Sequence, residues 1–135
     1  MLSYILKLFE LFTKLPKSVQ EQIINAIVDA FTYVFRRLFE TKNEEDLKKA
    51  TTQAVTPTQW ATTTVAVTNL VPSLYSQKKK EEFANSVIEL VKSDGFINQL
   101  SKRIDKINAA DEESYVALCS IETKRLIMEM MDQAK

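Results

Sequence analysis

Apolar positions dominate the first forty residues and predict two helices with unusually wide apolar faces. Between residues 1 and 15 the polar residues are few, and most follow one narrow stripe at spacings of three and four. A helix of this kind must bury most of its circumference. The first helix is expected over about 2–14, because Pro16 disfavours helical geometry at the residue before it.

The second helix is expected to begin after Ser18 and to continue to about residue 40. Ser18 suits the N-cap position, and Glu21 stands three residues later, where its side chain completes a capping box. The apolar arc of this helix is also too wide for one neighbouring helix to cover. Since the connection to the first helix is short, the pair is predicted to form an antiparallel hairpin over residues 1–40.

Helical periodicity continues beyond the hairpin and predicts five further helices between residues 44 and 134. Their expected ranges are about 44–54, 57–70, 76–93, 96–107 and 111–134. Asn43 is expected to cap the first of these, and Thr56, Pro57 and Gln59 form a typical helix start for the second. Gly95, the only glycine, is expected in a left-handed conformation that ends the helix over 76–93.

Residues 51–77 form an uncharged block that includes eight threonines. The β-branched residues at 62–67 favour a strand locally. No other strand-like run is present to pair with it, so a helix is expected. The polar residues and two prolines make the block too polar for a membrane span. We interpret it as a central helix that the other helices surround.

Taken together, these patterns predict one all-α domain over residues 1–135. The expected architecture is a helical bundle of about five to seven helices. Its N-terminal antiparallel helical hairpin packs against the helices over 57–70, 76–93 and 111–134.

Composition removes several classes of chemistry. The chain has no histidine and one glycine, whereas acid–base catalysis uses histidine most often and phosphate sites need glycine-rich loops. No catalytic residue, metal site or cofactor is therefore expected, and the chain is predicted not to be an enzyme, with only carboxylate-based catalysis left open. The acidic clusters at 44–46 and 111–113 are interpreted as helix starts, where the helix dipole stabilises carboxylates. Asn108 or Asp111 is expected to cap the last helix.

The charge balance limits the kinds of partner to expect, and the cysteine content limits the chemistry of the chain. Eighteen basic residues balance eighteen acidic ones, so a nucleic-acid partner is not expected and repulsion between copies is weak. The one cysteine, Cys119, lies within an apolar helical pattern and is interpreted as a buried, inert thiol. The N-terminal residues lack the features of a secretory signal. The expected location is cytoplasmic, with membrane association as the alternative.

The wide apolar face of the hairpin is the predicted interface. The side chains expected to carry it are Leu8, Phe12, Phe31, Phe35 and Phe39. These residues favour a non-enzymatic protein–protein interaction module, such as a small adaptor, inhibitor or regulator. Its partner would be another protein or a second copy, and a homodimer is the commonest solution.

A second candidate surface lies near the C-terminus, where Met128, Met130 and Met131 follow closely. Methionine suits adaptable binding surfaces, although filling the core is the plainer interpretation.

Two other functions stay open. The first helix, with lysines bordering a leucine and phenylalanine face, is typical of peripheral membrane binding, although the balanced charge argues against it. A bundle with surplus aromatic rings can also carry an apolar ligand.

Overall fold

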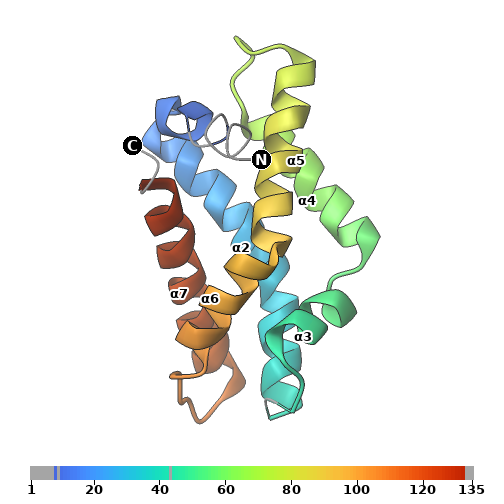
Figure 1. Cartoon of the computed structure of the whole chain (residues 1–135), viewed down its shortest axis with the longest axis vertical. Helices are drawn as coiled ribbons and strands as arrows, with labels where there is room; N and C mark the ends of the chain where they lie inside the picture. The colour runs from blue at the N-terminus through green and yellow to red at the C-terminus, as the bar shows by residue number, and fades with distance from the viewer. Residues whose placement is uncertain (1–7, 9, 43, 133–135) are drawn as a thin grey trace.

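The structure is a computed structural model that describes residue 8, residues 10–42 and residues 44–132, and this part of the chain is all-helical without strands (Figure 1). The predicted all-α class is confirmed. The helices are α2 (Lys17–Glu40), α3 (Leu47–Ala54), α4 (Pro57–Leu70), α5 (Gln77–Lys92), α6 (Asp94–Ile104) and α7 (Glu112–Asp132). Leu8 and residues 10–14 are helical as well. Most of the predicted first arm lies outside the described residues, so the hairpin stays a prediction.

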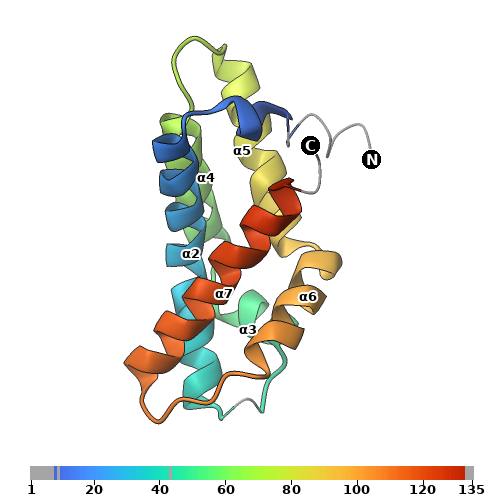
Figure 2. The same cartoon turned by 90° about the vertical axis from the view of Figure 1, so that its left-hand side faces the viewer.

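Helix α2 is the element around which the others pack. It contacts α3, α4 and α7, and α5 and α6 complete the core through α4 and α7. Figure 2 shows α7 running beside α2 with α4 on the far side of α2. The apolar arc of α2 is therefore covered from several directions. Its buried residues are Ile23, Ile24, Ile27, Val28, Ala30, Phe31, Val34, Phe35 and Leu38.

Helix α4 lies at the edge of the molecule, so the interpretation of the uncharged block as a central helix is wrong (Figure 1). Trp60, Val67 and Thr68 are its buried residues. The threonine hydroxyls donate to backbone carbonyls four residues earlier, as Thr62 does to Thr58 and Thr64 does to Trp60. Because these hydroxyls find acceptors within their own helix, the block needs neither charge nor burial to be satisfied.

The start of α4 is as predicted. The Thr56 hydroxyl oxygen accepts a hydrogen bond from the Gln59 N–H at 3.1 Å, and the Gln59 side chain accepts one from the Thr56 N–H at 2.7 Å. Pro57 occupies the first helical position, where no N–H is needed. The predicted helix start is confirmed, and its reciprocal hydrogen bonds form a capping box.

The predicted start of α2 is wrong. The helix begins at Lys17, and Pro16 occupies the N-cap position with no side-chain hydrogen bond, so Ser18 lies inside the first turn. The Pro16 φ is −56°, near the value that its pyrrolidine ring prefers, and the helix starts two residues earlier than predicted. Gln20 makes a different contact: its amide Nε2 donates to the carbonyls of Phe12 and Leu15 at the end of the preceding segment and leaves the first N–H groups of α2 without a side-chain cap.

The first acidic cluster does not form a first helical turn. Helix α3 begins at Leu47, and Asp46 caps it by accepting from the Lys49 N–H at 2.7 Å. Glu45 instead binds Arg37 of α2 at 2.5 Å, and this contact lowers the pKa of Glu45. The expected cap, Asn43, lies outside the described residues.

Gly95 does not end a helix, contrary to the prediction. It lies in the first turn of α6, and no glycine of the described chain has a positive φ. Ser93 separates α5 from α6 instead: its hydroxyl donates to the Leu90 carbonyl at 2.6 Å and accepts from the Phe96 N–H at 3.3 Å. Ser93, in an extended conformation, is therefore both the C-cap of α5 and the N-cap of α6.

The start of the last helix is as predicted. Asp111 accepts hydrogen bonds from the N–H and the hydroxyl of Ser114, at 2.8 and 3.1 Å. The hydrogen bond from the backbone N–H is the main cause of the lowered pKa of Asp111. Glu112 and Glu113 occupy the first turn of α7, where the helix dipole favours them.

Within the described residues, no helix combines the length and the apolar character needed to cross a bilayer.

Candidate functional site

The side chains of the predicted interface lie inside the core. Leu8 and Phe12 are each 4% exposed, and Phe31 and Phe35 are completely buried. Phe39 is half-buried, with its ring 5.6 Å from that of Tyr115 on α7. No outside partner is needed to cover these residues, because several helices of the same chain pack around α2. A partner could reach Phe31 or Phe35 only if α2 left the core.

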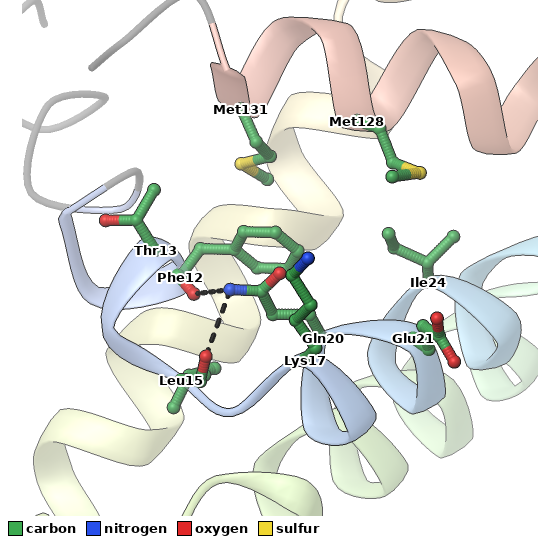
Figure 3. A pocket seen from close by; sticks show the side chains of 9 residues that line it. All are labelled: Phe12, Thr13, Leu15, Lys17, Gln20, Glu21, Ile24, Met128 and Met131. Atoms are coloured by element: carbon green, nitrogen blue, oxygen red, sulfur yellow. Dashed lines mark hydrogen bonds between the residues drawn. The ribbon is translucent and has the colours of Figure 1, made fainter.

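The predicted methionine cluster divides between surface and core. Met128 is 53% exposed, Met130 is half-buried and Met131 is buried. Met128 and Met131 both face a hollow that α7 forms with the N-terminal half of α2 (Figure 3). We call this hollow the α2–α7 groove.

The α2–α7 groove has a volume of about 300 Å³ and a lining of both apolar and polar side chains. Its apolar walls are Phe12, Leu15, Ile24, Met128 and Met131, and its polar residues are Thr13, Lys17, Gln20 and Glu21. A volume of this size is at the lower end of the range for small-molecule sites, roughly 300–1,000 Å³. The groove is therefore large enough for one small ligand or one apolar side-chain anchor.

The sequence explains how the groove is closed at one end. Pro16 ends the helical segment over 10–14, and the chain turns there into α2. Gln20 holds that turn by donating to the Phe12 carbonyl at 2.8 Å and to the Leu15 carbonyl at 3.0 Å (Figure 3). The turn brings Phe12 and Leu15 opposite the methionines of α7.

A second apolar feature runs along the outer side of α7. Leu118, Ile121 and Met128 are 43%, 45% and 53% exposed, and we call these three residues the α7 row. Cys119, Leu126 and Ile127 on the inner side of the same helix are buried. Helix α7 thus carries apolar side chains on two faces, of which the chain covers one.

Ion pairs hold three charged residues near the α7 row, namely Glu122, Arg125 and Glu129. Arg125 binds Glu122 one turn earlier at 3.0 Å. Arg103 of α6 contacts Glu122 at 3.7 Å and also binds Glu129, and the hydrogen bond to Glu129 raises the pKa of Arg103. These contacts fix α7 against α6. The α7 row stays exposed on a face of the helix that Glu122 borders on one edge and Lys124 on the other.

The apolar pattern of the last helix predicted Leu118 and Ile121 next to its buried stripe, and it did not predict a separate exposed face for them. A helical projection separates these two residues from the buried stripe. Positions 118 and 121 lie more than 100° from the centre of the stripe formed by Cys119, Leu126 and Ile127, given about 100° per residue.

The interpretation of Cys119 as a buried thiol is confirmed. Burial raises the pKa of Cys119 to about 12, and it raises the pKa of the neighbouring Tyr115 as well. A nucleophilic thiolate is therefore not available here near neutral pH. The residues that the structure describes hold no group of three or more side chains suited to a metal ion.

Comparison with protein-family models, with curated proteins and with solved structures finds no match to this chain.

Proposed function

We propose that this chain is a non-enzymatic protein–protein interaction module that self-associates through the α7 row. The observation that carries the proposal is the exposure of three large apolar side chains, Leu118, Ile121 and Met128, on one side of a single helix. Exposed apolar patches of this kind usually mark contact surfaces. The interaction role expected from the sequence is thus assigned to α7 instead of the N-terminal hairpin.

The spacing of the α7 row suits a second copy of the same helix. The three positions of the α7 row and position 125, which lies between 121 and 128, repeat at intervals of three and four, which is the spacing of the core positions in a coiled coil. Arg125 is the one charged residue among the four, and Glu122 of the same chain pairs with it. The row is therefore close to neutral and compatible with itself.

Charge complementarity at the edges favours two parallel α7 helices. In a parallel pair, residues five positions apart along the flanking edges face each other across the contact. That spacing places Lys124 of one copy beside Glu129 of the other, twice in a symmetric dimer, while Glu129 also binds Arg103 of its own chain. The balanced net charge adds little repulsion to oppose the association.

The first prediction concerns molar mass. Light scattering across a concentration series is expected to show the mass rising from 15.5 kDa toward twice that value. Ile121→Glu is expected to hold the mass at 15.5 kDa, because it places a charge in the row. Val65→Glu is the matched control, since Val65 is 58% exposed on α4 and should leave association unchanged.

Cross-linking tests the orientation. Because Cys119 is buried, a single Ile121→Cys exchange adds the one accessible thiol of the described chain. A parallel, in-register pair brings the two introduced thiols together, so mild oxidation is expected to give a disulfide-linked dimer. A mass that stays at 15.5 kDa up to millimolar concentration, or equal dissociation by Val65→Glu, contradicts the proposal.

A further inference from the structure

We infer that the α2–α7 groove binds one anionic amphiphile with a single apolar chain, of the kind represented by a medium-chain carboxylate. The groove is a cavity of about 300 Å³ with Phe12, Ile24 and Met131 among its walls. An apolar chain placed there would contact aromatic, branched and thioether groups on opposite sides, and methionine adapts readily to such contacts.

The charge of the ligand follows from the hydrogen-bond donors that remain available. Gln20 donates its side-chain amide hydrogens to the carbonyls of Phe12 and Leu15. Thr13 donates its hydroxyl hydrogen to the Glu10 carbonyl at 3.0 Å. Among the described side chains lining the groove, the Lys17 ammonium is the donor that forms no ion pair or side-chain hydrogen bond within the chain.

Lys17 is placed to meet an anionic head group. It lines the groove, and its side chain points toward Phe12 and the methionines of α7 (Figure 3). Glu21, the one carboxylate of the lining, lies a turn farther along α2 beside Ile24. A carboxylate beside Lys17 would gain a charge-assisted hydrogen bond while its chain lies among the apolar walls.

The volume of the groove limits the ligand to one apolar chain. A cavity at the lower end of the range for small-molecule sites does not hold the two acyl chains of a membrane phospholipid. The ligand is therefore a free amphiphile rather than a bilayer. The groove shares Met128 with the α7 row, but Phe12, Leu15, Ile24 and Met131 lie outside that row, so the Met131 resonance reports on the groove separately from self-association.

The test is a titration with sodium decanoate below its micellar concentration, followed through the methionine methyl resonances. The resonances of Met128 and Met131 are expected to shift and saturate at one ligand per chain, whereas that of Met130, which does not line the groove, stays in place. Decanol is expected to bind more weakly, and decylammonium more weakly still.

Charge reversal identifies the head-group contact. Lys17→Glu is expected to weaken decanoate binding about tenfold and to strengthen decylammonium binding, since one charge-assisted hydrogen bond is exchanged for repulsion. Lys14→Glu is the matched control: it makes the same change three residues away, at an exposed residue outside the groove, and should leave both affinities unchanged.

Three results would overturn the inference. The first is the absence of saturable shifts at Met128 and Met131. The second is equal binding of decanoate, decanol and decylammonium, or equal loss in the Lys17→Glu and Lys14→Glu variants. The third is co-sedimentation with phosphatidylglycerol vesicles without decanoate binding, which would assign the contact to a membrane surface.

Discussion

Phe31 lies where α2, α4 and α6 meet, and its surroundings show why the predicted interface is internal. Its ring centroid is 5.9 Å from those of Phe35 and Trp60 and 6.0 Å from that of Phe96. Aromatic pairs at such distances add stabilisation beyond the area that they bury. A side chain held by three rings from three segments stabilises the fold and offers nothing to a partner.

Replacement of Phe31 is therefore expected to act on stability. Phe31→Ala should lower the free energy of unfolding by about 3–5 kcal/mol, as for other buried aromatic residues. Tyr33→Ala is the control, because Tyr33 is 49% exposed two residues away and should change stability by at most about 0.5 kcal/mol. Urea denaturation followed by circular dichroism measures both. A Phe31→Ala chain that keeps its stability would place this ring outside the core.

Cys119 leads to a pH-dependent prediction. The pKa of its thiol rises from an ordinary value of 9.0 to about 12 in the folded chain, because burial disfavours the thiolate. The unfolded chain loses this proton at lower pH, so the stabilisation is complete below pH 9.0 and falls as the pH rises toward about 12. The urea midpoint should fall over this window, and less steeply in Cys119→Ala. Identical slopes would show that this thiol does not contribute.

At the scale of elements, helix starts divide into those set by local contacts and those set by context. The contacts at the start of α4 join residues only three positions apart, so the sequence predicts Thr56 correctly as its cap. Ser18 satisfies the same local rule, yet Pro16 starts α2 before it. Local rules thus identify suitable caps but do not choose between neighbouring candidates.

The two caps can be compared directly. Thr56→Ala is expected to lower the free energy of unfolding by about 1 kcal/mol, because it removes the acceptor for the Gln59 N–H. Ser18→Ala is expected to have little effect, since Ser18 makes no capping contact. Thermal denaturation of the two variants checks the difference, and a larger loss for Ser18→Ala would restore it as the cap of α2.

Helix α7 shows a further limit of periodicity. Its apolar residues occupy two faces, and a pattern alone does not say which face the chain covers. The contacts with α2 and α6 bury Cys119 and Ile127 and leave Ile121 exposed. The candidate interface therefore depends on where α7 docks, a property that only the packing of distant segments decides.

At the scale of the whole molecule, one continuous core joins the described helices. It includes most of the apolar residues that the sequence marked as a surplus in the hairpin. What stays outside is a small set of large apolar side chains, of which Leu118, Ile121 and Met128 belong to α7. The proposed self-association uses this remainder, and the α2–α7 groove lies next to it through Met128.

The sequence alone determined the all-α class, the end of the first helical segment at Pro16, and the starts of α4 and α7. These features depend on helix propensity, proline geometry and hydrogen bonds between near neighbours, all of which are local. Only the tertiary structure decided that Phe31 and Phe35 are core, that α4 is peripheral and that Ile121 is exposed. Burial is a property of contacts between distant segments, and a helix with too much apolar surface does not reveal how many neighbours will cover it.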